Sequence, residues 1–408
     1  MGEAKARALN VVCLASYFKG AEFIRECRRQ GARVFLLTRE RTLGEEWPRE
    51  SIEEIIPVPD DATPELFLHI MTQLARRQRV DRLLALEEYD VLLAASIREH
   101  LCMAGMGTTT TRVFRDKLSM RVRAAEAGIL VPPFVHVLNY EALRQFMSRV
   151  PSPWVLKPRS DVSAMGIKKL EGSEQVWRAI DILDARAALN EQSSYYLLER
   201  FVAGDVYHVD SLTEGGEVAF QWASRYGRPP MEVAHEGGVF LSYTVEHDSE
   251  DERQLFEINR RLLSSLGLRR GAAHAEFIKA ARDGRFYFLE VAARVGGAYT
   301  AENVEAASGV NLWREWAKIE LAGDEHRVGV EASRREYSGI VLSLARQQQP
   351  DTSAYDDPEV AYRVVKRYHA GLIVRSPEQE RVRGLLDEYA RRFAEDFCAV
   401  APPLERPN

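Results

Sequence analysis

Residues 274–297 read HAEFIKAARDGRFYFLEVAARVGG, and the fold can be argued from this stretch outward. Asp283-Gly284 in its middle is a hairpin signal, because glycine takes the positive φ that a tight turn needs. A three-residue loop over Arg282–Gly284 sets a register in which Glu276 faces Glu290. The stretch therefore predicts two antiparallel strands with two carboxylates directly opposite each other.

Alternation of side chains assigns the rest of the hairpin to two faces. The face expected to be buried is apolar: Ala275, Phe277, Tyr287, Leu289, Val291 and Ala293. The other face holds the polar groups and one aromatic ring: His274, Glu276, Phe288, Glu290 and Arg294. Opposed carboxylates with Cβ atoms roughly 5 Å apart repel each other, so a positive group should lie between them. Mg²⁺ suits such oxygens, and Arg294 could meet the charge of a transferring phosphoryl group. A solvated polar face neutralised by Arg294 is the alternative.

The composition describes an ordinary globular chain. It has 408 residues, 46% hydrophobic and 28% charged, which predicts two to four domains. A net charge of −6 argues against general nucleic-acid binding, which requires a basic surface.

The cysteines and apolar runs bear on the compartment. Four cysteines stand at positions 13, 27, 102 and 398 without a CxxC or a metal-ligand spacing, as expected for reduced thiols. The first residues, MGEAKARALN, contain no apolar run of a targeting segment. No apolar run approaches 18 residues. We therefore expect a cytoplasmic protein with no membrane association.

The chain opens with a βαβ pattern. Strands are expected at 11–15 and 34–37, with a helix between them that ends near Gln30, so the first sheet should be parallel and Rossmann-like. It has no GxGxxG, which makes dinucleotide binding a weak reading. Ligands in such sheets bind at the carboxyl ends of strands. The Ser16–Gly20 loop and the Glu87–Asp90 turn are therefore candidate substrate walls, with ordinary polar turns as the alternative.

The middle of the chain holds a second charged site. Lys157 ends the apolar strand 154–158, and burying a lysine there is costly unless it meets an anion. The following loop and strand, RSDVSAMGIKKL at 159–170, is polar with a single glycine, and such loops can cover phosphates with backbone N–H groups. A plain hairpin is the alternative. No Walker A motif occurs in the sequence.

The order of these signals resembles the ATP-grasp superfamily over nearly the whole chain. FRDKLSMR at 114–121 resembles the helix whose lysine contacts the nucleotide, here Lys117, and WVLKP places a second ATP lysine at Lys157. The 159–170 segment takes the place of the loop that folds over the phosphates, with Ser163 and Ser160 as contacts. LLERFVAGDVYHVD at 197–210 resembles the adenine-binding hinge.

The resemblance also assigns individual roles. Glu199 would face the adenine amino group, and the backbone of Phe201 and Val202 would face the ring. Glu276 and Glu290 would bind Mg²⁺ or Mn²⁺. Arg294 would be the catalytic arginine that stabilises the phosphoryl group.

Two departures from the family pattern concern single positions. Where many members have the ribose-binding glutamate, this chain has Val206, so Asp205 would serve only if a bulge turned it round; His208 or Asp210 are the alternatives. Where many members have an asparagine metal ligand, this chain has Ala292. An aspartate elsewhere in the chain or a water molecule would then take the place of the asparagine.

The resemblance implies an α/β fold of four units. These are a Rossmann-like pre-ATP-grasp domain at 1–112, a lid at 113–192, a large subdomain with the metal and ATP site at 193–330, and a small α/β unit at 331–408. It implies an ADP-forming carboxylate–amine ligase that activates a carboxylate, expected to be an amino acid, as an acylphosphate and joins it to an amine. A homodimer is plausible by the same resemblance. The alternatives are a carboxylase-type enzyme that phosphorylates bicarbonate and a non-catalytic ATP-binding protein.

Overall fold

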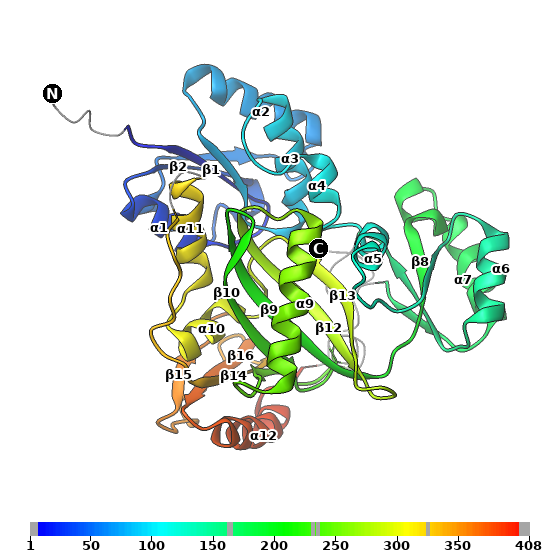
Figure 1. Ribbon diagram of the computed structural model, residues 1–408. Coiled ribbons are helices and arrows are strands. Elements are labelled where there is room, and N and C mark those ends of the chain that lie inside the picture. The colour runs from blue at the N-terminus through cyan, green and yellow to red at the C-terminus, as the bar shows by residue number, and fades with distance from the viewer. Residues whose placement is uncertain (1–6, 161–165, 230–232, 234–236, 324–326, 400–408) are drawn as a thin grey trace.

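Three sheets organise the computed structural model (Figure 1). It describes residues 7–160, 166–229, 233, 237–323 and 327–399. Within these ranges, no helix is both long enough and apolar enough to cross a lipid bilayer.

The first sheet is parallel, as the βαβ pattern predicts, with strand order β3-β2-β1-β4. Its strands are β1 (Asn10–Ala15), β2 (Arg33–Arg39), β3 (Glu54–Val58) and β4 (Arg82–Ala85). The helices of this unit are α1 (Ala21–Arg29), α2 (Pro64–Arg77), α3 (Val91–His100) and α4 (Thr108–Arg112). β1 is buried along its whole length. Pro57 lies in the edge strand β3, where its missing N–H costs no ladder bond.

The second sheet lies in the region predicted as the lid and stands apart from the rest in Figure 1. Its strand order is β5-β8-β6-β7: β5 (Phe134–His136), β6 (Trp154–Pro158), β7 (Lys168–Leu170) and β8 (Tyr196–Arg200). The helices α6 (Tyr140–Arg149) and α7 (Ser173–Asp184) complete it. The predicted boundary at residue 192 falls too early, because β8 pairs with both β5 and β6. The helix α5 (Lys117–Glu126), expected in the lid, contacts α9 and β13 of the large sheet instead.

The third sheet has eight strands in the order β13-β12-β9-β10-β11-β14-β16-β15. The strands are β9 (Gly204–Glu214), β10 (Glu217–Tyr226), β11 (Phe240–Thr244), β12 (Gly271–Ala280), β13 (Phe286–Ala292), β14 (Tyr337–Leu344), β15 (Val360–Arg363) and β16 (His369–Ser376). The helices of this part are α9 (Glu250–Leu266), α10 (Thr300–Ser308), α11 (Leu312–Ala322) and α12 (Gln379–Asp396). One core cluster joins this sheet and α11 to the first sheet, and another lies under α5 and α9.

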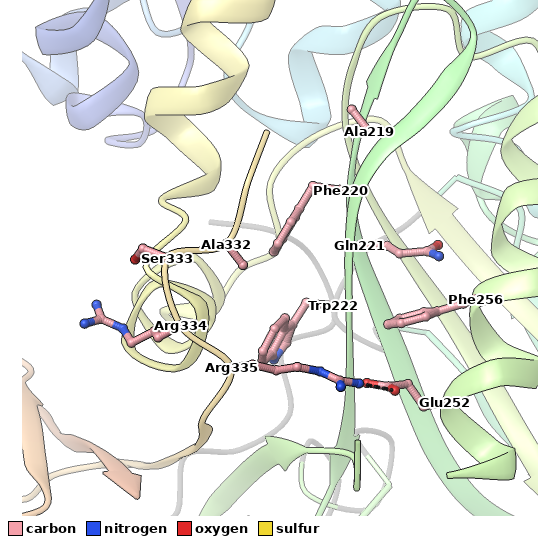
Figure 2. Close-up of a pocket in the computed structure, with 10 residues that line it drawn as sticks. All are labelled: Ala219, Phe220, Gln221, Trp222, Glu252, Phe256, Ala332, Ser333, Arg334 and Arg335. Carbon is pink, nitrogen blue, oxygen red and sulfur yellow. Dashed lines mark hydrogen bonds and ion pairs between the residues drawn. The ribbon is translucent and has the colours of Figure 1, made fainter. Parts of the chain in front are cut away.

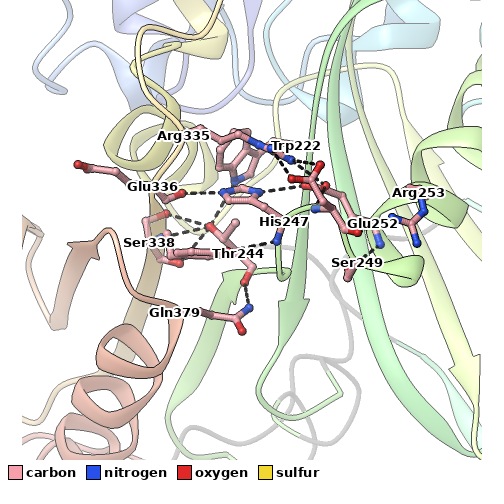
Figure 3. Close-up of polar contacts among 12 residues, drawn as sticks. Trp222, Thr244, His247, Ser249, Glu252, Arg253, Arg335, Glu336, Ser338 and Gln379 are labelled. Atoms are coloured by element: carbon pink, nitrogen blue, oxygen red, sulfur yellow. Dashed lines mark hydrogen bonds and ion pairs between the residues drawn. The ribbon is translucent and has the colours of Figure 1, made fainter.

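The carboxyl-terminal unit, expected to be separate, continues this sheet, because β14 pairs with β11. Polar contacts fasten it further (Figure 3). Gln379 Nε2 donates to the carbonyl oxygen of Thr244 at 2.9 Å. The ring of His247 lies between the carboxylate of Glu252, at 3.0 Å, and the carbonyl oxygen of Glu336, at 3.1 Å.

The central hairpin confirms the predicted pair and corrects its turn. Glu276 faces Glu290, and Gly284 has a positive φ of 67°. The loop is one residue longer than expected, because Ala280 N donates to Arg285 O. A bulge at Leu289 compensates, since Phe277 pairs with Phe288.

The longer loop and the bulge move three side chains to the opposite face from the one predicted. Phe288 packs in the core beside Phe277, whereas Tyr287 and Leu289 pack with Ile278 on the other face, so these three face assignments were wrong.

Candidate functional site

The two opposed carboxylates each meet a donor from another strand or helix. Lys117 Nζ lies 2.8 Å from Glu290 Oε2. Tyr226 Oη, from β10, donates to Glu276 Oε1 at 2.8 Å. Burial alone would raise the pKa of Glu290, but the ammonium of Lys117 lowers it to about 2. Glu290 is therefore ionised at neutral pH, and the repulsion expected across the ladder is relieved by a lysine.

Lys117 is held in place by the start of its own helix. It is the first residue of α5, and the carboxylate of the N-cap residue Asp116 accepts from the amides of Leu118 and Ser119. Asp116 also forms an ion pair with Arg159, which follows β6. The amide of Lys117 donates to the carbonyl oxygen of Arg159 at 2.7 Å. The start of α5 is thus fixed to the end of β6, which carries Lys157.

Lys157 lies in a buried charge cluster that the sequence only partly indicated. Its Nζ is 2.5 Å from Glu199 Oε1, and Arg121 Nε donates to Glu199 Oε2 at 3.0 Å. Burial and the guanidinium of Arg121 lower the pKa of Lys157 to about 8. Burial raises the pKa of Glu199, but Arg121 and Lys157 together hold it below its usual value. Arg121, which has no exposed surface, was missed by sequence reasoning because a helix arginine is usually solvated.

Arg294 is anchored by the first domain. Its Nε donates to Glu88 Oε2 at 2.7 Å, and Arg115 Nη1 donates to Glu88 Oε1 at 2.7 Å. Glu88 lies in the Glu87–Asp90 turn, which the sequence marked as a candidate wall. Asp90 in the same turn accepts from the amide and the hydroxyl of Ser16, at 2.6 and 2.7 Å. The two predicted walls therefore meet each other, and one of them reaches Arg294.

A row of buried polar side chains lies behind Glu276. Asp210 accepts from His208 Nδ1 at 2.7 Å and from His274 Nδ1 at 2.8 Å. His208 Nε2 is 2.7 Å from the hydroxyl of Ser242, so both of its ring nitrogens have protein partners. Burial opposes the charged form of His274, but Asp210 and Glu276 raise its pKa to about 10. His208 therefore supports this row and has no ring nitrogen left over for a ribose.

Asp205 does not join the cluster. The register between β9 and β12 is unbroken, with Asp205 opposite Lys279 and His208 opposite Glu276, so Asp205 lies on the other face of the sheet. Its carboxylate pairs with Arg225 at 2.7 Å. The bulge that its ribose-binding role required is absent from this ladder, so the register does not support that role.

The remaining hinge residues lie between the lid and the large sheet. The amide of Phe201 donates to the carbonyl oxygen of Pro153 at 3.0 Å. The ammonium of Lys169 lies 4.6 Å from the centre of the Phe201 ring. Val202 packs against an apolar cluster that includes Val206 and Tyr226. An adenine contact by this backbone stays a prediction. Ser163 lies outside the described residues.

A cleft of about 550 Å³ lies elsewhere, between β10 and residues 332–335 (Figure 2). Phe220 and Trp222 point to one side of the strand, and Gln221 points to the other, toward Phe256. None of the described residues predicted for the nucleotide or the metal lines it. The charged cluster, rather than this cleft, is therefore the candidate site.

The donor set fits a magnesium nucleotide. Glu276 and Glu290 offer carboxylate oxygens from adjacent strands, the ligand type that Mg²⁺ prefers. Lys117, Lys157 and Arg294 supply three positive charges from α5, β6 and the end of β13, as a polyphosphate would require. The carboxylate of Glu290, which pairs with the ammonium of Lys117, would also attract a metal cation.

Comparisons with known proteins point to one superfamily. The ATP-grasp domain family matches residues 150–302, and the ATP-grasp N-terminal domain family matches residues 24–103. The chain belongs to the ATP-grasp superfamily and is similar to its L-amino acid ligases.

One curated relative is an L-arginine-specific L-amino acid ligase of Bacillus subtilis. It is 22% identical over 272 residues, which cover 65% of this chain and 64% of the relative. The match thus spans slightly less than two thirds of that protein.

Solved structures share the fold over almost the whole chain. An L-amino acid ligase from Bacillus licheniformis superposes with a TM-score of 0.76 and 18% identity, covering 97% of this chain and 99% of that one. The biotin carboxylase domain of the Hydrogenobacter thermophilus 2-oxoglutarate carboxylase, solved with MgADP and bicarbonate, superposes with a TM-score of 0.70 and 15% identity, covering 95% and 90%.

Proposed function

We propose that this chain is an ADP-forming carboxylate–amine ligase that uses ATP and Mg²⁺ or Mn²⁺ to join an amino-acid carboxylate to an amine. The observation that carries the proposal is the pairing of Glu276 with Glu290 beside Lys117, with Arg294 held at the end of the same strand by Glu88. The similarity to L-amino acid ligases supports the substrate class.

The reaction needs two displacements, the first at phosphorus and the second at carbon. A carboxylate oxygen of the first substrate attacks the γ-phosphorus of ATP, and the bond to the bridging oxygen breaks to release ADP. The amine of the second substrate then attacks the acyl carbon of the acylphosphate. Phosphate leaves with the bonding electron pair, the amine nitrogen loses a proton, and an amide remains. Positioning and charge neutralisation dominate such a transfer, so no protein nucleophile is required.

Each charged residue has a distinct task in this proposal. Glu276 and Glu290 hold the divalent cation, which neutralises charge on the phosphates when it is bound. Lys157 and Lys117 bind phosphate oxygens, and Arg294 stabilises the charge on the transferred phosphoryl group. Glu88 fixes the guanidinium of Arg294, at 2.7 Å, before substrate arrives.

Two other functions give different results in one assay. A carboxylase-type enzyme would release ADP in response to bicarbonate, as the fold shared with a biotin carboxylase domain allows. A non-catalytic ATP-binding protein would bind ATP without turnover, and it would have no use for a phosphoryl-stabilising Arg294.

ADP release, measured with Mg²⁺ and a panel of amino-acid pairs with and without bicarbonate, tests the proposal. We expect release that depends on particular amino acids and not on bicarbonate. Arg294→Ala should abolish release with the fold intact, whereas Arg285→Ala, an exposed arginine on the same hairpin, should leave it unchanged. Release that persists in Arg294→Ala would refute the role of this arginine.

A homodimer and a cytoplasmic location also remain proposals. Size-exclusion chromatography with light scattering would test the first, and cell fractionation the second.

A further inference from the structure

A second cavity, of about 340 Å³, lies where the first sheet meets the large sheet. It is enclosed by β4 and α3 on one side, by α4 on another, and by the start of β12 with α11 on the third. The polar side chains that matter for its chemistry are those of Arg82, Arg98, Thr111, Arg270, Trp316 and Glu320. Ala272 of β12 also lines it, four residues from Glu276 and therefore about 13 Å away along the strand. None of the described residues proposed for the nucleotide or the metal lines the cavity, although Ala293, next to Arg294, does.

Arg98 presents a buried charge to this cavity. Only 8% of the residue is exposed. Its guanidinium donates to the carbonyl oxygen of Leu83 at 3.0 Å and to that of Met106 at 2.8 and 3.1 Å. In the part of the chain that the structure describes, it forms no ion pair. Burial disfavours its charged form, while Glu320 and Glu99 favour that form from beyond ion-pair distance. An anion in the cavity would supply the direct counter-charge that the guanidinium lacks.

Thr111 adds an unused donor on another wall. The residue has no exposed surface, and its hydroxyl has no hydrogen-bond partner among the described residues. Buried hydroxyls nearly always have a partner, so an unpaired one on a residue that lines a cavity points to a ligand or water. A hydroxyl can donate to an oxyanion in the same way as the guanidinium of Arg98.

The lining carries an excess of positive charge. Glu320 is the acidic residue of the lining, and both of its oxygens are engaged, Oε1 by Trp316 Nε1 at 2.9 Å and Oε2 by Arg270 Nε at 2.9 Å. Arg82 donates to a backbone carbonyl, that of Glu320, at 3.0 Å, and it also lines the cavity. Positive groups therefore outnumber negative ones, while Leu83 and Trp316 supply apolar surface.

We propose that this cavity binds a small organic anion whose carboxylate or phosphate oxygens accept from Arg98 and Thr111. Guanidinium groups bind both kinds of oxyanion through parallel N–H donors. The apolar walls would contact the carbon skeleton of the ligand. The volume admits a molecule of a few carbon atoms, such as a dicarboxylate.

Thermal unfolding and isothermal titration with inorganic phosphate and with succinate, each alone, test this proposal and separate the two oxyanions. We expect one of them to raise the Tm of the unmodified protein. Thr111→Val should weaken binding roughly 5-fold, as the loss of one hydrogen bond implies. Arg98→Gln, which keeps donors for Leu83 and Met106, should weaken it about 10-fold or more.

The controls make a negative result decisive. Thr109→Val changes an exposed residue of the same helix and should leave binding unchanged. Thr111→Val should not lower the Tm without ligand, because it removes only an unpaired hydroxyl. The proposal is overturned if neither anion binds at millimolar concentration. It is equally overturned if an anion binds with the same affinity to Thr111→Val and Arg98→Gln, since that anion would then occupy another site.

Discussion

The ammonium of Lys117 lies 2.8 Å from the carboxylate of Glu290, so a helix and a strand bring opposite charges together at the proposed metal site. Lys117 is almost fully buried, whereas the side chain of Glu290 keeps 35% of its surface exposed. The carboxylate can therefore still be reached from solvent by a cation. The position of Lys117 follows from the N-cap of α5, and that of Glu290 follows from the register of the hairpin. Both features are fixed by local sequence.

Replacing Glu290 by glutamine should remove activity and keep the fold. We expect ADP release to fall roughly 10²–10³-fold, because the site loses a charge that acts on the transferring group through the cation. The Tm should fall as well, because the buried ammonium of Lys117 loses its counter-charge. Glu174→Gln, on the exposed face of α7, is the matched control. Activity close to that of the unmodified protein would show that Glu290 does not bind the metal.

Glu88 should matter for stability as well as for activity. Its carboxylate is shared by Arg294 and Arg115, each at 2.7 Å, and all three side chains are largely buried. Glu88→Gln leaves two guanidinium groups without their counter-charge, which should cost about 3–5 kcal/mol in the free energy of unfolding. Urea denaturation would measure it, with the exposed Glu46→Gln as control. A loss below about 1 kcal/mol, the value of an exposed ion pair, would contradict the shared role.

The sequence predicted those parts of the fold that depend on local pattern. The Glu276–Glu290 pair, the positive φ of Gly284 and the parallel order of the first strands all follow from turn chemistry and alternation. The Leu289 bulge was missed. The longer loop shifts the strand register by one residue and the bulge shifts it back, so the pairing of Glu276 with Glu290 is unchanged and only the residues between the turn and the bulge are displaced. Phe288, Tyr287 and Leu289 were therefore placed on the wrong faces.

Other parts of the site depend on contacts between distant segments and leave little local signal. Arg121 is read as a solvated helix residue until Glu199 is known to lie beside it. The partner of Arg294 comes from a turn 206 residues earlier in the chain. Strand β8 belongs to the lid because of its neighbours β5 and β6, and its own residues do not indicate this.

The protonation of Lys157 should set the alkaline limit of activity. Burial and Arg121 lower its pKa to about 8, so its positive charge is lost as the pH rises through that value. We expect kcat/KM for ATP to fall about tenfold per pH unit above pH 8, because a neutral amine cannot pair with phosphate. Lys157→Arg, which keeps its charge, should lose this alkaline limb. A profile that stays flat well above pH 8 would argue against Lys157 as a phosphate ligand.

The same titration should not unfold the protein. The folded-state pKa of Lys157 lies below the ordinary lysine value of 10.5, so the unfolded chain binds the proton more tightly between pH 8 and 10.5. The contribution of this lysine to stability therefore rises with pH across that window. Tm measured over the same range separates a loss of activity from a loss of structure.

Two adjacent glycines provide a final contrast. A Cβ added at Gly296 would lie 2.9 Å from Asp210 Oδ1 and 2.9 Å from His274 Nδ1, the two atoms that form the hydrogen bond behind Glu276. A Cβ at Gly297 would meet no heavy atom within 4 Å. Gly296→Ala should therefore push Asp210 and His274 apart and lower stability by about 1–3 kcal/mol, the usual cost of overpacking.

Gly297→Ala should be close to neutral, so the pair separates a steric clash from a general need for glycine after β13. Urea denaturation of both variants measures the difference, and ADP release should fall only in Gly296→Ala, because Glu276 is the next polar side chain along this row. Equal stability of the two variants would mean that Asp210 and His274 can give way. The row of polar side chains behind Glu276 would then be too soft to hold that carboxylate in place.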